Sequence, residues 1–206
     1  MTYGSCVVQK EIEATFLETD HDQIRERLTA LGATRRQPEY VMRRAVFDLP
    51  DNRLDQQAAW VRVRQEHNSV TVCYKQRLSE SIDGMREIEF VASNYDLASE
   101  FLLAIGMKHK AYQETKREMW VLDGVEIMLD TWPWIPPYVE VEGKTEAAVR
   151  AVAERLGFDW SLALFDSADG VYQRYYDVTR TEISSVDLTF SAMPELLQQR
   201  ARPGAQ

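Results

Sequence analysis

Apolar and polar residues alternate over several short stretches of the chain, and three other stretches carry apolar residues at helical spacing. The alternation is strictest near the N-terminus, over residues 11–16. Because successive side chains of a β-strand point to opposite faces, Glu11, Glu13 and Thr15 share one face there. Apolar side chains occupy the other face. This pattern predicts a strand within residues 7–17 that has one charged face and one apolar face.

The same alternation recurs along the chain, where nine strand-like runs predict a sheet of about eight strands. Further strands are expected at residues 40–49, 60–66, 70–77, 85–91, 108–113, 114–122, 125–131 and 138–143. Asp123-Gly124, between two of these runs, is a strong signal for a hairpin. The aromatic and proline-rich residues 132–137 favour a rigid, packed loop. Neighbouring strands joined by turns or by one helix indicate an antiparallel sheet.

Three helices are expected, beginning at the N-caps Asp20, either Asn94 or Ser93, and Thr145, and ending near glycines. Each carries an apolar stripe, and in the second helix the stripe is Leu97, Phe101 and Ile105. Such stripes could cover the outside of a curved sheet. The fold class predicted is α+β, with a closed eight-stranded antiparallel sheet and helices packed outside it.

Charged residues share one face within most of the predicted strands. They are Glu11 with Glu13, Arg62 with Arg64, Lys75 with Arg77, Glu87 with Glu89, Asp130 with Glu126, and Glu140 with Glu142. Two interpretations are open. The charged faces could be solvated, with cross-strand ion pairs, which is the commoner arrangement. Alternatively, they could line the inside of a closed sheet, where buried charges would need partners, metals or ligands.

The types of charge suggest a chemistry for the second interpretation. Paired carboxylates provide the oxygen ligands that Mg²⁺ and Mn²⁺ prefer. The pair Arg62 and Arg64, with Lys75 on the neighbouring strand of a hairpin, suits phosphate groups. Carboxylates for a metal and cations for phosphate in one cavity are what phosphoryl chemistry needs.

Composition narrows the partners and the location. The 206 residues are 45% hydrophobic, enough for a sizeable core, and the net charge of −9 argues against a nucleic-acid surface. No apolar run approaches the roughly 18 residues of a membrane-spanning helix, and the first residues do not resemble a secretory signal. Cys6 and Cys73 are too few for a disulfide framework and fit free thiols. We therefore expect a cytoplasmic protein with no membrane partner.

Seven segments together resemble the CYTH family of triphosphate tunnel metalloenzymes, over about residues 7–176. They are Glu11-Ile12-Glu13, Trp60-Val61-Arg62-Val63-Arg64, Lys75, Arg86-Glu87-Ile88-Glu89, Lys116-Arg117-Glu118, Asp130 and Tyr138-Val139-Glu140-Val141-Glu142. This family includes class IV adenylyl cyclases, thiamine triphosphatases and inorganic triphosphatases. The resemblance implies an eight-stranded antiparallel β-tunnel with a charged lumen. Residues 177–206 would form a C-terminal tail, either a peripheral helix or disordered.

The resemblance also implies roles for individual residues. Glu11, Glu13, Asp130, Glu140 and Glu142 would bind one or two Mg²⁺ or Mn²⁺ ions; Arg62, Arg64, Lys75 and Arg117 would bind the triphosphate; Glu87, Glu89 and Thr15 would line the tunnel; and Glu11, Glu13, Arg62 and Lys75 would be catalytic. One position departs from the pattern Glu-x-Glu-x-Lys, because Thr15 stands where the lysine is expected. A late basic residue of some relatives also has no clear counterpart, although Arg174 or Lys144 could replace it.

The function predicted is hydrolysis of a triphosphate-bearing small molecule, such as inorganic tripolyphosphate, a nucleoside triphosphate or thiamine triphosphate. A class IV-type adenylyl cyclase that makes cyclic AMP from ATP is one alternative, because it would use the same phosphate-binding residues. A non-catalytic binder of triphosphate or polyphosphate is another, and the missing lysine at Thr15 is its motivation.

Overall fold

The computed structural model describes residues 9–10 and 12–203, so Cys6 and Glu11 lie outside the described residues. The strands are β1 (Gln9–Lys10), β2 (Glu13–Phe16), β3 (Thr34–Asp48), β4 (Ala59–Gln65), β5 (Val70–Arg77), β6 (Met85–Ala92), β7 (Lys108–Leu122), β8 (Val125–Thr131) and β9 (Tyr138–Glu142). The helices are α1 (His21–Ala30), α2 (Arg53–Gln56), α3 (Tyr95–Ala104), α4 (Glu146–Arg155), α5 (Ala168–Tyr175), α6 (Arg180–Ile183) and α7 (Glu195–Arg200), with a 3-10 turn at Trp160–Leu162.

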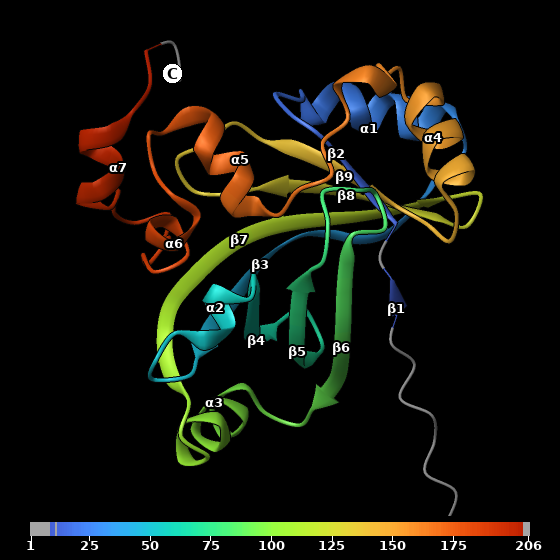
Figure 1. The fold of residues 1–206 in the computed structure, drawn as a ribbon. Coiled ribbons are helices and arrows are strands. Elements are labelled where there is room, and N and C mark those ends of the chain that lie inside the picture. The colour runs from blue at the N-terminus through green and yellow to red at the C-terminus, as the bar shows by residue number, and fades with distance from the viewer. Residues whose placement is uncertain (1–8, 11, 204–206) are drawn as a thin grey trace, which may run out of the picture.

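All strands belong to one antiparallel sheet in the order β1-β6-β5-β4-β3-β7-β8-β9-β2. The sheet is strongly curled into a half-barrel (Figure 1). The N-terminal segment contributes to both edges, because β1 pairs with β6 and β2 pairs with β9. The predicted α+β class and the antiparallel sheet are confirmed. Closure of the sheet into a tunnel is not seen among the described residues.

Two strands are longer than the sequence pattern predicted. β3 begins at Thr34 rather than near residue 40, and its pairing with β7 shifts register between Gln37 and Tyr40, the stretch that contains Pro38. Proline cannot donate to a sheet ladder, so a register irregularity is where it is tolerated. The two strands predicted at 108–113 and 114–122 are one continuous strand, β7. The predicted hairpin is confirmed, because Asp123 and Gly124 both have positive φ angles between β7 and β8.

The three predicted helix starts are confirmed by their caps. The side chains of Asp20, Asn94 and Thr145 each accept hydrogen bonds from backbone N–H groups in the first turn of α1, α3 and α4. These bonds satisfy donors that have no partner inside the helix. Local sequence therefore fixes where the outer helices begin.

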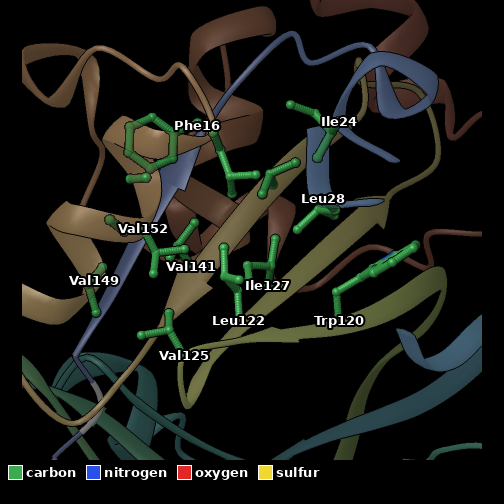
Figure 2. Close-up of a cluster of buried hydrophobic side chains, with 14 of the residues drawn as sticks. Phe16, Ile24, Leu28, Trp120, Leu122, Val125, Ile127, Val141, Val149 and Val152 are labelled. Carbon is green, nitrogen blue, oxygen red and sulfur yellow. The ribbon is translucent and has the colours of Figure 1, made fainter. Parts of the chain in front are cut away.

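The main core lies on the outer, apolar side of β2 and β7–β9, beneath α1 and α4. Ile24 and Leu28 of α1 and Val149 and Val152 of α4 are buried there against the sheet (Figure 2). Phe16 joins this core and stacks on Phe158, with 4.3 Å between the ring centroids. The apolar residues of the alternating strands thus face the helices, and the opposite faces of these strands point into the concave side.

The stripe predicted for α3 is wrong. Leu97, Phe101 and Ile105 are 62%, 61% and 59% exposed. The helix instead buries Tyr95 and Leu102 against the outer face of β4, β5 and β7. Both faces of this helix carry apolar side chains, so the spacing of apolar residues could not show which face packs on the sheet.

The C-terminal part of the chain packs through a second apolar cluster. Tyr172, Ile183, Leu188 and Leu197 are buried there together with Trp132. This cluster places α5, α6 and α7 beside the loop that follows β8 (Figure 1). Trp132 is 6% exposed, which agrees with the rigid packed loop expected for residues 132–137. None of the described helices is long and apolar enough to cross a membrane.

Candidate functional site

The charged strand faces line a cavity of about 400 Å³ on the concave side of the sheet. It is bounded by β2–β5 and β7–β9 and by the C-terminal helices α5 and α6. Seven of the predicted site residues line it, namely Glu13, Arg62, Arg64, Lys75, Arg117, Glu140 and Glu142. These charged faces therefore line the concave side of the curled sheet, where cross-strand ion pairs also occur. Glu87, Glu89, Asp130 and Thr15 lie on the same strand faces without lining this cavity.

The register of β4, β5 and β6 gathers the predicted cations. Arg62 lies opposite Cys73, and Lys75 lies opposite Glu87. The Nζ atom of Lys75 is 3.2 Å from a Glu87 carboxylate oxygen. Arg62 is held more loosely, with its Nη2 atom 3.9 Å from Glu87 and 3.8 Å from Glu89. Glu87 and Glu89, which do not line the cavity, thus neutralise part of the positive charge of Arg62 and Lys75.

Arg62 and Arg64 keep unused hydrogen-bonding capacity although Arg62 is buried and the side chain of Arg64 is only 15% exposed. Nε and Nη2 of Arg62 and Nε of Arg64 have no hydrogen-bond partner among the described residues. Arg64 does form an ion pair with Glu66, at 2.5 Å. Burial, followed by the neighbouring Arg62, lowers the pKa of Arg64. Buried donors without partners are uncommon in folded proteins, and they fit a site whose acceptor comes from a ligand.

Arg117 on β7 joins the cations to the carboxylates. Its Nε donates to Asp130 at 2.7 Å, and its Nη2 donates to Asp130 at 2.5 Å and to Glu140 at 2.6 Å. Burial lowers the pKa of Arg117, but the carboxylates of Asp130 and Glu140 outweigh burial and raise it well above its ordinary value. Burial and the nearby Asp130 raise the pKa of Glu140 to about 7.

The predicted carboxylates come from adjacent strands. Glu13 on β2 lies opposite Glu142 on β9, and Glu126 on β8 also lies opposite Glu142. Glu13, Asp130, Glu140 and Glu142 do not bring three ligand atoms within 4.8 Å of one another in the described part of the chain. Their common face and their oxygen donors still suit a hard divalent cation.

Cys73, Glu87 and Glu89 do offer three ligand atoms within 4.8 Å of one another. This group is a poor cation site, because Arg62 and Lys75 already lie against its carboxylates. In addition, burial raises the pKa of the Cys73 thiol well above its ordinary value. The thiol donates a hydrogen bond to Glu87 at 2.7 Å. It therefore packs in the wall of the cavity as a protonated thiol, not as a thiolate ligand.

Thr15 is buried, at 1% exposure, and lies opposite Glu140. Its backbone forms two hydrogen bonds with Leu164, each 2.9 Å long. The position therefore faces the carboxylates but adds no charge. Arg174 and Lys144, the candidate replacements for a late basic residue, are both exposed and do not line the cavity.

Four cations that line the cavity were not predicted from the sequence as site residues, namely Arg44, Arg77, Lys110 and Arg180. Arg44 was not predicted because Arg43 and Arg44 are adjacent in β3. Alternation alone does not determine which of the two side chains faces the cavity. Arg77 shares the face of Lys75, and this parity was the one signal that could have identified it. Lys110 and Arg180 lie in segments without a clear charge pattern.

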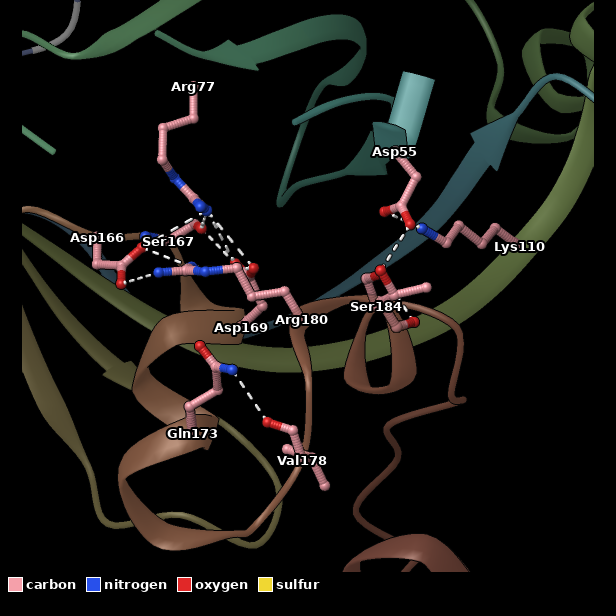
Figure 3. A network of polar contacts seen from close by, with 11 residues as sticks. Asp55, Arg77, Lys110, Asp166, Ser167, Asp169, Gln173, Val178, Arg180 and Ser184 are labelled. Carbon is pink, nitrogen blue, oxygen red and sulfur yellow. Dashed lines mark hydrogen bonds and ion pairs between the residues drawn. The ribbon is translucent and has the colours of Figure 1, made fainter. Parts of the chain in front are cut away.

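Figure 3 shows three of these four cations in contacts that hold the C-terminal segment: Arg77 and Lys110 on the sheet side, and Arg180 within the segment itself. Arg77 at the end of β5 contacts Ser167, Asp166 and Asp169 at the start of α5. Arg180 of α6 donates to the same two aspartates, at 2.6 Å to Asp166 and 3.1 Å to Asp169. Substituting Gly170 would disturb this network, because a Cβ atom there would lie 1.9 Å from Asp166.

Lys110 anchors a second point of this segment through Asp55. The two side chains are 2.6 Å apart, and Asp55 also accepts a hydrogen bond from Thr181, at 2.9 Å. Lys110, Arg77 and Arg180 thus have carboxylate partners supplied by α2 and α5. Their role in this structure is to hold one end of the cavity in place.

Comparison with known families identifies the chain. The model of the CYTH domain matches residues 9–176, and the chain therefore belongs to the CYTH family. The resemblance noted in the sequence is confirmed. Members of this family are enzymes that handle triphosphates and typically use a divalent metal. Among curated proteins, none matches the chain.

Solved structures show the same fold at low sequence identity. A proposed adenylate cyclase from Vibrio parahaemolyticus superposes with a TM-score of 0.71 at 15% identity, covering 81% of this chain and 99% of that one. The PH1012 protein of Pyrococcus horikoshii gives 0.64 at 21% identity, covering 76% and 96%. A Hippeastrum protein, proposed as an adenylyl cyclase and described with a dominant triphosphatase activity, gives 0.58 at 14%, covering 80% and 95%. These similarities show the fold alone.

Proposed function

We propose that this protein is a metal-dependent hydrolase of a small molecule that carries a triphosphate. The observation that carries the proposal is that a cluster of cations and a cluster of carboxylates line one cavity of about 400 Å³. Arg62, Arg64 and Lys75 form the first cluster, and Glu140 and Glu142 belong to the second. Membership of the CYTH family supports the same class of substrate.

The cations suit a polyanion because their donors are not all used within the protein. Within residues 9–10 and 12–203, Arg62 has two nitrogen atoms without a hydrogen-bond partner, and Arg64 has one. Guanidinium groups bind phosphoryl oxygens through charge-assisted hydrogen bonds, which are stronger than neutral ones. In the proposed complex, Arg62, Arg64 and Lys75 hold the phosphoryl oxygens and offset their charge, which grows on the leaving oxygen during hydrolysis.

The carboxylates fit a divalent ion such as Mg²⁺ or Mn²⁺. Asp130 and Glu140 already share one cation, the guanidinium of Arg117. Glu13, Glu140 and Glu142, with Asp130 behind them, are the described residues that would hold the ion. Glu11, which shares their predicted strand face, would complete the set. When bound, such an ion would polarise a phosphoryl oxygen and neutralise part of the substrate charge.

Hydrolysis requires a water oxygen to form a bond to phosphorus while the bond to the bridging oxygen breaks. We assign the glutamates of β2 and β9 to orienting this water and accepting its proton, since they line the same cavity as Arg62 and Arg64. The proposal includes the closed tunnel as the active form, in which β1 and β2 would join the two edges of the sheet around the substrate.

Product analysis tests the proposal directly. The full chain is incubated with tripolyphosphate, ATP and thiamine triphosphate, each with Mg²⁺, with Mn²⁺ and with EDTA, and phosphate and cyclic AMP are measured in parallel. We expect metal-dependent phosphate release. Cyclic AMP and pyrophosphate from ATP would instead indicate a cyclase, and tight binding without any product would indicate a binder. Either of these results would refute hydrolysis.

Two variants link activity to the site. Glu140→Gln and Arg62→Ala should each abolish metal-dependent turnover and leave the fold intact. Glu154→Gln and Arg150→Ala are matched controls, because this pair lies on the exposed face of α4, with side chains 50% and 54% exposed. Full activity in either site variant would show that the assignment of the site is wrong.

A further inference from the structure

Arg44 is a buried cation of the cavity for which the sequence pattern gives no role. It lies on β3 opposite Arg64 of β4 and is 6% exposed. Its Nη2 atom donates to the Thr115 hydroxyl at 2.8 Å. The guanidinium carbon lies 4.5 Å from the centre of the Trp132 ring. The side chain is therefore held in one place, at the wall of the cavity.

Its charge is not matched within the described part of the chain. No carboxylate there forms an ion pair with Arg44, and its Nε atom has no hydrogen-bond partner among the same residues. Each of the other cations that line the cavity, namely Arg62, Arg64, Lys75, Arg77, Lys110, Arg117 and Arg180, has at least one carboxylate within 4.0 Å. An unpaired buried charge is costly unless a ligand completes it.

The neighbours of Arg44 increase this mismatch. Burial, followed by the positive charges of Arg62, Arg64 and Arg117, lowers the pKa of Arg44 to about 9. Asp130 acts in the opposite direction but contributes less than these effects. Arg44 and these three arginines thus place four mutually repelling guanidinium groups on one cavity. An anion with several negative charges would satisfy all of them, whereas a single carboxylate would not.

We propose that Arg44 binds a phosphoryl oxygen of the substrate from the β3 side of the cavity, with Trp132 and Thr115 fixing its orientation. The proposal rests on the function proposed above and adds a binding residue to it. Stacking on an aromatic ring and a fork of donors are properties of arginine that lysine lacks. One edge of the guanidinium is engaged by Thr115, and Nε is left for the ligand.

A purely structural role makes the opposite prediction about stability. If Arg44 served only to connect β3 to Thr115 and Trp132, its removal would weaken the fold. If its charge is uncompensated until a ligand binds, replacing it with an apolar side chain of similar length should leave the unliganded fold as stable or more stable. Arg44→Met therefore separates the two roles.

Binding of tripolyphosphate is measured by calorimetry in the presence of EDTA and again with Mn²⁺, together with thermal unfolding of the unliganded protein. We expect Arg44→Met to keep or raise the midpoint of unfolding and to weaken tripolyphosphate binding about 10- to 100-fold, the loss of a charge-assisted hydrogen bond. Arg44→Lys should recover only part of the affinity, because the charge returns without the fork.

Arg43→Met is the matched control. Arg43 is the neighbouring residue of the same strand, stacks on Tyr95 at 4.3 Å and donates to Gln65 at 2.6 Å, so it faces away from the cavity. Its replacement should leave tripolyphosphate affinity unchanged. Unchanged affinity in Arg44→Met would overturn the proposal for Arg44 alone. No binding of tripolyphosphate by the unaltered protein would instead overturn the proposed function, and the role of Arg44 with it.

Discussion

Replacing Arg117 should lower the free energy of unfolding, because Arg117 neutralises the carboxylates of Asp130 and Glu140. Arg117 makes three hydrogen bonds to Asp130 and Glu140, and Asp130 is fully buried. Arg117→Met would leave both carboxylates without their cation. Breaking a buried pair in this way costs about 3–5 kcal/mol, which is a large share of the roughly 5–15 kcal/mol that stabilises a typical domain. Urea unfolding in EDTA measures this loss.

The same variant reports on the metal site. If the carboxylates bind a divalent ion, Mn²⁺ should restore part of the stability that Arg117→Met loses, because the ion would replace the missing positive charge. Adding Asp130→Asn and Glu140→Gln to this variant should restore stability in EDTA and remove the effect of Mn²⁺. A loss below about 1 kcal/mol in EDTA would refute the reasoning, as would a response to Mn²⁺ that survives removal of both carboxylates.

Three further predictions follow from burial and charge. Leu102→Ala, at a buried position of α3, should lower the free energy of unfolding by about 2–5 kcal/mol. Phe101→Ala, at an exposed position of the same helix, should change it by less than about 0.5 kcal/mol. Urea unfolding of both variants checks the orientation of α3. In a Cys6→Ser background, Cys73 should resist alkylation by iodoacetamide at pH 8 until the protein unfolds. Burial raises the pKa of this thiol, and Cys73 is 0% exposed. Rapid labelling of the native protein, measured by mass spectrometry, would contradict this. Thr15→Lys should raise metal-dependent turnover, because the new charge would face Glu140, while Thr15→Met should not; equal rates in both variants would show that charge at this position does not limit the reaction.

The sequence could predict the charged face because alternation in a strand has one physical cause. Side chains two residues apart must lie on the same side, so Arg62 with Arg64 and Glu140 with Glu142 were paired before any tertiary contact was known. The same argument fails for Arg43 and Arg44, where adjacent cations occupy both faces of β3. It fails again for α3, whose two apolar faces compete for the sheet.

Contacts distant in sequence were not predictable from local pattern. The attachment of Arg77 to Asp166 and Asp169 joins residues about ninety positions apart through irregular loops. The spacing of these residues does not predict the contact, because loops lack the periodic apolar–polar pattern of strands and helices. The family resemblance indicated which strands form the site, but it gave no information on the segment after residue 176. The structure shows that this segment, through α6, forms one end of the cavity.

The order of the strands explains how the cavity separates its charges. Arg44, Arg62, Arg64 and Lys75 come from β3–β5, and Glu13, Asp130, Glu140 and Glu142 come from β2, β8 and β9. β7 lies between these groups in the sheet, and its Arg117 joins them through Asp130. In a flat sheet the two groups would lie several strands apart, at about 4.8 Å a strand. Curling the sheet turns them toward each other across one cavity, so that a polyanion can lie on one wall while the carboxylates of the other wall hold its counter-ion. A shift of one residue in any of these strands would turn its charges outward. The function we propose therefore depends on the register and the curvature of the sheet as much as on the identity of the charged residues.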